Sequence, residues 1–356
     1  MSTAIETDAL IIGAGPVGLF QVFQLGLQGL AAHVVDVLDA PGGQCIALYA
    51  DKALYDIPGV PRCTGRELTH NLLQQSQPFA PQFHFGQQVD ALKRHADRRW
   101  HVTTSIKQQP CQQFLARSVF IAAGVGAFVP KELKVDGLAA FLGRQLYYHA
   151  QAPSTFAGKN VVIVGGEDAA VANALALTQG GKARAKSVTL LHRRDVLQAN
   201  VVDLARFAEL RQAGQIQFQA GQVTGIQTAG ELLSGLIVNT PDNQTLTLAL
   251  DAMLVCSGLS PKLGPITQWG LAMERKQLCV STETFATSEP GLFAVGDVVT
   301  YPGKKKLIVC GFHEATLAAF AAAKLINPNE SGVLQYTTSS ALLQQRLGLK
   351  PDTDPA

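Results

Sequence analysis

The pattern that most constrains the fold lies between residues 8 and 36. An apolar run ends at Gly13, and glycines follow at Gly15 and Gly18 before a helical stretch and a second apolar run that closes on Asp36. In this arrangement the first glycine permits a tight turn, the second lets a pyrophosphate approach the backbone, and the third lets the helix pack closely on the strand. The sequence predicts a βαβ unit that binds a dinucleotide through the turn and a ribose through Asp36. The competing interpretation, a glycine turn that binds nothing, is disfavoured because all the parts occur in order.

A second strand, turn and helix follow at residues 160–179, and the next apolar strand ends in basic residues where the first unit has its acid. An arginine at this position accommodates a 2′-phosphate, so the second unit is predicted to bind NADPH rather than NADH. The alternative for the two arginines is a solvated surface pair. The residues predicted to form this site are Gly165, Gly166, His192, Arg193 and Arg194. Glu167 stands at the position of the middle glycine, and an anionic side chain facing two phosphates would weaken binding.

Glycine-rich bends after apolar strands mark two places where the chain is expected to cross between domains. These bends lie within residues 118–130 and 251–259, and small residues followed by proline allow a chain to leave one sheet for another. We expect a first domain over 1–124, an inserted domain over 125–256, and a return to the first domain over 257–356. The predicted class is α/β, with one Rossmann-like domain inserted into another.

Composition narrows the functional classes. The chain has 356 residues, of which 47% are hydrophobic and only 16% charged, which predicts extensive buried surface and leaves room for a subunit interface. A net charge of +2 without a basic, aromatic-rich stripe argues against nucleic-acid binding. The most apolar helical stretch, 315–326, is shorter than the ~20 residues that cross a bilayer, and the residues before the first strand leave no room for a signal segment. The expectation is a cytoplasmic protein without membrane contact.

The cysteines give no sign of a disulfide pair or a metal site. They occur at Cys45, Cys63, Cys111, Cys256, Cys279 and Cys310, with no C-x-x-C pair and no metal-ligand spacing. We expect reduced, mostly buried thiols and no metal.

Several further motifs, taken in order, resemble the ferredoxin–NADP reductases of the thioredoxin-reductase-like type, within the two-dinucleotide-binding flavoprotein superfamily. They are Gly42-Gly43-Gln44, Ala47-Leu48-Tyr49, Tyr55-Asp56-Ile57-Pro58-Gly59, His192-Arg193-Arg194-Asp195, Ala294-Val295-Gly296-Asp297 and Thr300-Tyr301-Pro302-Gly303-Lys304. The resemblance covers nearly the whole chain. It implies that the first domain holds FAD, that the inserted domain holds NADPH, and that a homodimer passes electrons to ferredoxin or flavodoxin.

The resemblance also assigns residues to the cofactor. By position, those implied to contact FAD are Gly13, Gly15, Pro16, Val17, Gly18, Asp36, Gly43, Gln44, Tyr49, Val89, Phe128, Asp297 and Thr337. Tyr49 would stack on one face of the isoalloxazine, and Tyr336, where many members have histidine, on the other. No acid–base residue is expected, because the flavin itself carries the chemistry. The basic run Lys304-Lys305-Lys306 is a candidate docking face for an acidic ferredoxin, with a solvated loop as the alternative.

Two departures from the family pattern concern the nicotinamide site. Glu167 replaces a glycine, and Gln198 replaces an arginine that usually follows the basic segment. They leave open a flavoprotein with weakened or lost NADPH use that acts as a binding or regulatory protein. The absence of C-x-x-C separates the chain from thioredoxin reductases, although a disulfide reductase using cysteines distant in sequence remains a third interpretation.

Overall fold

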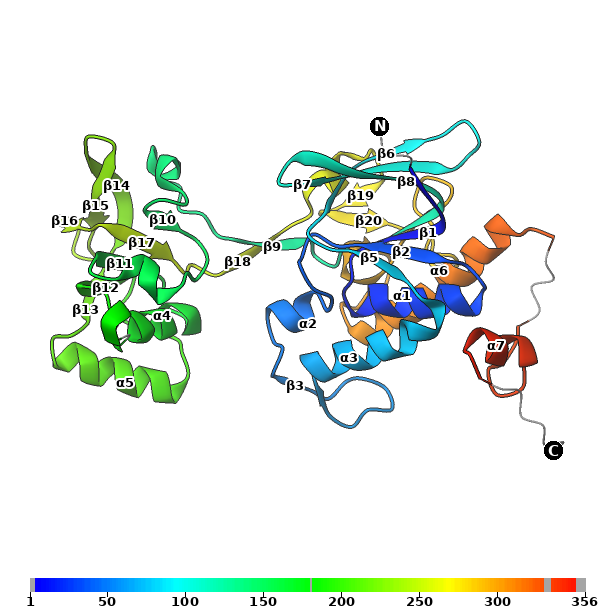
Figure 1. Cartoon of the computed structure of the whole chain (residues 1–356), viewed down its shortest axis with the longest axis horizontal. Helices are drawn as coiled ribbons and strands as arrows, with labels where there is room; N and C mark the ends of the chain where they lie inside the picture. The colour runs from blue at the N-terminus through cyan, green and yellow to red at the C-terminus, as the bar shows by residue number, and fades with distance from the viewer. Residues whose placement is uncertain (1–3, 180, 330–333, 350–356) are drawn as a thin grey trace. The chain divides into compact units, whose positions relative to one another are not determined.

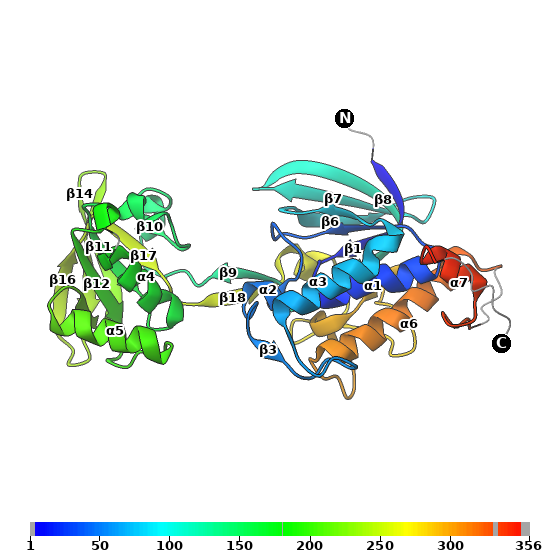
Figure 2. The same cartoon turned by 60° about the horizontal axis from the view of Figure 1, so that its bottom comes forward.

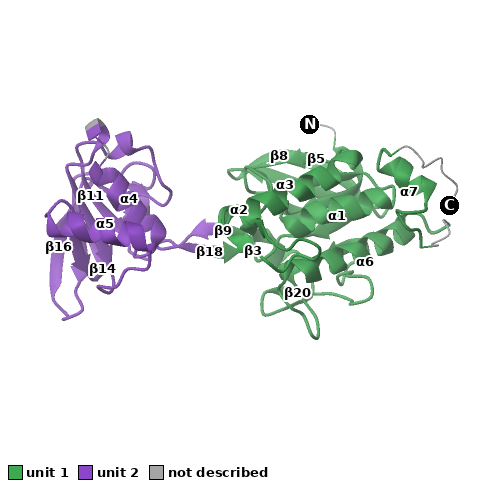
Figure 3. Cartoon of the chain, turned by 90° about the horizontal axis from the view of Figure 1, so that it is seen from below, with its two compact units in different colours: residues 1–127, 261–356 green, residues 128–260 purple. Residues whose placement is uncertain are grey.

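The structure, a computed structural model, describes residues 4–179, 181–329 and 334–349. The chain forms two compact units, residues 1–127 with 261–356 (unit 1) and residues 128–260 (unit 2), coloured separately in Figure 3. The chain passes from one unit to the other through β9 (Ala127–Pro130) and returns through β18 (Leu259–Lys262), and these two strands pair with each other.

Unit 1 is built on a seven-stranded sheet. The strands run in the order β5 (Gln82–His84), β2 (Ala32–Val35), β1 (Ile5–Ile12), β8 (Gln109–Ile121), β7 (Trp100–Ile106) and β6 (Gln88–Arg94), with β21 (Leu292–Ala294) also paired to β8. The pairs from β5 to β8, and the pair of β8 with β21, are parallel. The pairs of β8 with β7 and of β7 with β6 are antiparallel. The parallel part is the half that carries the first glycine turn.

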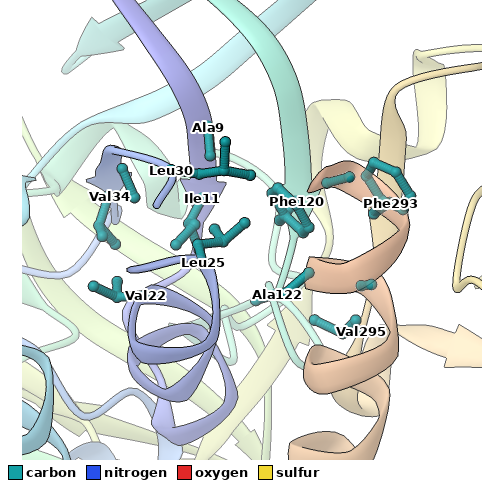
Figure 4. Close-up of a cluster of buried hydrophobic side chains, with 14 of the residues drawn as sticks. Ala9, Ile11, Val22, Leu25, Leu30, Val34, Phe120, Ala122, Phe293 and Val295 are labelled. Carbon is teal, nitrogen blue, oxygen red and sulfur yellow. The ribbon is translucent and has the colours of Figure 1, made fainter. Parts of the chain in front are cut away.

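Three helices lie side by side on unit 1, as Figure 2 shows. They are α3 (Gly65–Ser76), α1 (Pro16–Leu27) and α6 (Ile308–Ile326). Apolar side chains of α1, α6 and the parallel strands form one buried cluster, drawn in Figure 4 around Ile11, Leu25 and Phe120. The helix α3 begins where the Thr64 side chain accepts a hydrogen bond from the Glu67 backbone and the Glu67 carboxylate bonds back, a capping box that satisfies two free amides.

Short elements complete unit 1. They are α2 (Gln44–Ala47), β3 (Ala53–Leu54), β4 (Cys63–Thr64), β19 (Met273–Glu274), β20 (Gln277–Cys279), β22 (Val299–Thr300) and α7 (Ala341–Arg346), with 3-10 turns at Gln77–Phe79, Gly264–Gln268 and Gly296–Val298. The 3-10 turn at Gly296–Val298 connects β21 to β22 and contains the Gly-Asp pair singled out in the sequence.

Unit 2 has a five-stranded parallel sheet and a separate three-stranded antiparallel sheet. The parallel order is β10 (Leu146–Tyr147), β17 (Ala252–Val255), β11 (Asn160–Val164), β12 (Ser187–His192) and β13 (Gln217–Ala220). The antiparallel strands are β14 (Gln222–Ala229), β15 (Leu232–Asn239) and β16 (Thr245–Ala249), and the helices are α4 (Asp168–Gln179) and α5 (Val201–Gln212), with 3-10 turns at Leu138–Phe141, Pro153–Phe156 and Gly181–Ala183. The predicted α/β class, with one Rossmann-like unit inserted into another, is confirmed.

The helix α6 differs from expectation in length. It begins at Ile308, so its 19 residues are long and apolar enough to cross a membrane by length and composition alone. The expected apolar stretch of 315–326 was too short because the first two turns are less uniformly apolar. One face of α6 packs on α1 in the buried cluster, and its second turn carries the buried, ion-paired Glu314. These are features of a core helix.

Candidate dinucleotide sites

The first glycine turn has no room for side chains at two of its three glycines. Gly13 has a φ of +110°, and a Cβ there would lie 2.5 Å from the Ala122 carbonyl oxygen. A Cβ on Gly18 would lie 1.9 Å from the Gly13 carbonyl oxygen. Both contacts are with backbone, which cannot move aside. These two glycines therefore serve the packing of α1 against β1 and β8.

Gly15 is different, because a Cβ there would meet no atom within 4 Å. It precedes Pro16, the first residue of α1, so the free amides of the helix face this open space. Gly43 approaches it from the other side, since a Cβ on Gly43 would lie 3.0 Å from the Gly15 Cα. The Gly42 amide fixes this loop by donating to the Ala14 carbonyl at 2.8 Å. A helix N-terminus with open space and closely placed backbone fits a pyrophosphate.

Asp36 lies at the end of β2, as the ribose-binding interpretation requires. Its carboxylate accepts hydrogen bonds from the Ala14 amide at 2.6 Å and from the Leu38 amide at 2.8 Å. Burial raises the pKa of Asp36, and these backbone donors oppose that rise. The side chain is thereby held beside the glycine turn with lone pairs left for a hydroxyl group.

Three further candidates for the cofactor are placed as follows. Val17 is half-buried and lies against the positions where Gly296 and Gly311 would carry a Cβ. The Val89 side chain is buried in the unit 1 core, so only its backbone is free to meet a ligand. The side chain of Phe128 lies outside the described part of the structure.

Three of the predicted flavin-side residues come together near the first turn. The Gln44 amide nitrogen is 3.1 Å from the position of a Cβ on Gly124. Tyr49 is half-buried, and its hydroxyl accepts a hydrogen bond from the Cys45 thiol at 3.5 Å. Burial raises the pKa of Tyr49, and the nearby negative charge of Asp297 raises it further. Tyr49 therefore stays neutral, which suits a ring that stacks on an aromatic ligand.

Tyr336 and Thr337 are not brought to this place. Tyr336 is 64% exposed, and its carbonyl accepts hydrogen bonds from two serine amides at the start of α7. The Arg346 guanidinium in α7 donates to the Leu27 carbonyl at the last residue of α1. Gly15 is at the other end of this helix, about 18 Å away at 1.5 Å per residue. Figure 1 shows α7 at the end of α1 remote from α2.

Lys304 is not part of an exposed basic run. Its side chain is only 6% exposed, and its ammonium group is paired with the buried carboxylate of Glu314. The prediction of three docking lysines was wrong at this position, because a charged partner ten residues further along takes the side chain into the interior. Lys305 and Lys306 are exposed.

The second turn, in unit 2, also depends on close packing. A Cβ on Gly165 would lie 2.4 Å from the Cys256 carbonyl oxygen, and one on Gly166 would lie 2.7 Å from the His192 ring. The backbone amide of Gln198 donates to the Gly166 carbonyl at 2.7 Å, and Gln198 forms a β-bridge with Glu167. The two departures noticed in the sequence are therefore neighbours on one edge of the turn.

Arg193 and Arg194 are exposed at the end of β12, and no carboxylate pairs with either among the described residues. The carboxylate of the adjacent Asp195 forms a salt bridge with the Arg211 guanidinium at 3.0 Å instead. Burial and the charges of the two arginines lower the pKa of His192, against the opposing effect of Glu167. The site therefore offers two unpaired cations beside a neutral histidine.

The cysteines are free, but fewer are buried than expected. Cys45 and Cys63 are buried, Cys111 is exposed, and the other three are intermediate. The prediction of mostly buried thiols was wrong: Cys111 lies on the exposed outer part of β8, and Cys256, Cys279 and Cys310 are only partly buried. Burial raises the pKa of Cys45 and Cys63, which disfavours the reactive thiolate. No cluster of three metal-binding side chains occurs among the residues that were described.

Sequence reasoning missed the residues that support Asp297. Glu314 and Gln277 both bond to the backbone of this turn. The signal available in the sequence was Glu314 itself, the one acidic residue of a helix made mostly of small and apolar side chains.

Comparison with known proteins covers nearly the whole chain. A family described as pyridine nucleotide-disulphide oxidoreductase matches residues 7–320. Ferredoxin–NADP reductases from Albidiferax ferrireducens and Paracidovorax citrulli are 55% and 54% identical, each over 97% of this chain and 97% of the relative.

Solved structures share the fold at much lower identity. A thioredoxin reductase from Lactococcus lactis is 22% identical, with a TM-score of 0.57 over 90% of this chain and 99% of its own. A bacillithiol disulfide reductase from Staphylococcus aureus is 16% identical, with a TM-score of 0.61 over 92% of this chain and 100% of its own.

Proposed function

The chain belongs to the pyridine nucleotide-disulphide oxidoreductase family and, within it, to the ferredoxin–NADP reductases, and from this premise we propose that it transfers electrons between NADPH and a small ferredoxin or flavodoxin, with FAD as its cofactor. The observation that carries the proposal is the presence of two glycine turns, each at the carboxyl end of a parallel β-strand and the start of a helix. Open α/β sheets bind dinucleotides at this place.

FAD is assigned to unit 1, where the residues fit it. The open space at Gly15 and the amides of α1 would take the pyrophosphate, Asp36 the adenosine ribose, and Asp297 the hydroxyls on the flavin side. Tyr49 would cover one face of the ring system. When bound, FAD would supply the chemistry that takes up two electrons as a hydride and releases them one at a time. The chain's own contribution is to bind and orient the two cofactors, without a proton-transferring residue.

NADPH is assigned to unit 2. Arg193 and Arg194 are the proposed partners of the 2′-phosphate, supported by their exposure and by the pairing of Asp195 with Arg211 instead. Glu167 opposes the pyrophosphate electrostatically. The proposed enzyme therefore binds NADPH mainly through its adenosine end.

Lys305 and Lys306 are proposed to contact an acidic acceptor protein. They are exposed and lie just before α6, whose Ile308 and Phe312 pack on the cluster that contains Tyr49. Replacing both lysines by glutamate should raise the KM for ferredoxin at low salt and leave the NADPH reaction unchanged. An unchanged KM would remove the docking role.

A cytoplasmic homodimer is also proposed. It is supported by the low charged fraction and by large apolar side chains exposed on α6, with Phe320 at 38% and Leu325 at 50%. Both are available for contact with a second copy.

Anaerobic titration of the purified flavoprotein with NADPH tests the main proposal. The flavin absorbance should bleach with NADPH at concentrations where NADH is ineffective, and added ferredoxin should restore it. A flavin that remains oxidised with excess NADPH would contradict the proposal.

A further inference from the structure

The backbone around Asp297 is fixed from both sides by side chains remote in sequence. The Gly296 amide donates to the Glu314 Oε2 at 2.6 Å. The Gln277 amide nitrogen donates to the Asp297 carbonyl at 3.3 Å and to the Val299 carbonyl at 2.8 Å. The turn that carries Asp297 is therefore tied to α6 on one side and to β20 on the other.

Glu314 is fully buried, yet its carboxylate is well satisfied. The Tyr301 hydroxyl donates to its Oε1 at 2.7 Å, and the Lys304 ammonium pairs with the same oxygen. A buried carboxylate is tolerated when a cation and further donors replace its lost hydration. The three donors come from the 3-10 turn and from the loop that leads into α6, so one side chain joins these segments.

The position of Gly296 matters because the turn lies against the start of α1. Gly296 has a φ of +83°, and a Cβ there would lie 3.5 Å from the Val17 side chain. No protein group donates to the Asp297 carboxylate among the described residues, so the carboxylate is free to accept from a ligand. Its direction depends on the backbone of Gly296 and Asp297.

We propose that Glu314 is a positioning residue for the flavin cofactor: by holding the Gly296 amide against α6, it directs the Asp297 carboxylate toward the flavin-side hydroxyl groups. This inference rests on the proposed FAD site in unit 1. Glu314 itself does not touch the cofactor.

The test compares FAD binding by the wild-type protein and by Glu314→Gln, each stripped of flavin and titrated with FAD. Glutamine keeps the size, but its one carbonyl oxygen stays with the Tyr301 and Lys304 donors. Its NH2 group then faces the Gly296 amide, which is also a donor, so the Gly296 contact is lost. We expect the FAD Kd to rise about tenfold, as for loss of a hydrogen bond to a charged group, and the FAD-induced rise in Tm to shrink. Tyr301→Phe leaves the Gly296 contact in place and should change the Kd less than about threefold.

Val102→Ala is the matched control for destabilisation alone, because Val102 is buried in unit 1 on the antiparallel part of the sheet. It should lower the Tm of the stripped protein and leave the FAD Kd unchanged. If Glu314→Gln behaves in the same way, the residue is merely structural and the inference is overturned. If Glu314→Gln does not fold, Glu314→Asp keeps the charge but draws it back from Gly296, and an unchanged FAD Kd in this variant overturns the inference. Wild-type protein that fails to bind FAD would instead refute the proposed function.

Discussion

Gly15 and Gly18 are three residues apart in one turn, yet the structure gives them opposite sensitivities to alanine. A methyl group on Gly15 enters open space, and the φ of −70° and ψ of 178° suit any residue. A methyl group on Gly18 would come to 1.9 Å from a backbone oxygen, about 1.5 Å short of ordinary van der Waals contact. Alanine should therefore impair cofactor binding at the first position and folding at the second.

The magnitudes separate the two variants clearly. Gly18→Ala forces α1 away from the strand, and overpacking of this kind costs about 1–3 kcal/mol, or roughly 2–12 °C in Tm for a unit of this size. Gly15→Ala should leave the Tm of the flavin-free protein within about 2 °C, because surface substitutions without new contacts change stability by no more than about 0.5 kcal/mol. Its methyl group occupies the place of the pyrophosphate, and loss of one charged hydrogen bond, about 1.5–3 kcal/mol, raises the FAD Kd roughly 10- to 150-fold.

Both quantities can be measured on the same samples. Flavin is removed, the Tm of the stripped protein is recorded, and FAD is added back while its fluorescence quenching is followed. The reasoning is refuted if Gly15→Ala lowers the Tm of the stripped protein as much as Gly18→Ala does, or if it binds FAD as the wild type does.

Three further predictions concern other parts of the chain. Replacing Arg193 and Arg194 by glutamine should raise the KM for NADPH about tenfold or more with little change for NADH, and equal losses for both nucleotides would contradict the 2′-phosphate assignment. Glu167→Gly should lower the KM for NADPH, which steady-state kinetics would show, whereas an unchanged value would mean that the carboxylate turns away from the phosphates. The rings of His33 and His84 lie with two nitrogens 2.9 Å apart, and burial lowers the pKa of both below the ordinary 6.5. As the pH drops below about 6.5, the unfolded chain therefore takes up protons before the folded chain does, and the free energy of unfolding should fall. The double asparagine variant should show a flatter Tm profile between pH 7.5 and 5.5, and an identical slope would exclude the histidines as the cause.

The glycine turns were predictable from sequence because their constraint is local. Gly13 and Gly18 are needed by a strand, a turn and a helix that are contiguous in the chain, and the acid at the end of the next strand follows from the same unit. Lys304 was misassigned for the opposite reason. Its environment is decided by Glu314, which reaches it only after α6 has packed in unit 1, and no local pattern distinguishes it from its two exposed neighbours.

The flavin-stacking role of Tyr336 stays a prediction. A resemblance to related chains places Tyr336 at the flavin, but the position of the segment depends on where α7 packs. In the structure Arg346 fixes α7 to the end of α1. The identity of the side chain was available from sequence, whereas its neighbours were not.

The pairing of β8 with β21 has a consequence for how the protein is made. These adjacent strands pair Val119 with Leu292 and Ile121 with Ala294, so the sheet of unit 1 cannot be completed on the ribosome until nearly the whole chain has emerged. Unit 2 is one continuous segment between them, and it can fold while the first part of unit 1 still lacks β21. Once folded, it holds the ends β9 and β18 together, which shortens the effective loop that β21 must close to reach β8. Because unit 2 is synthesised before β21, its folding helps unit 1 to complete its sheet.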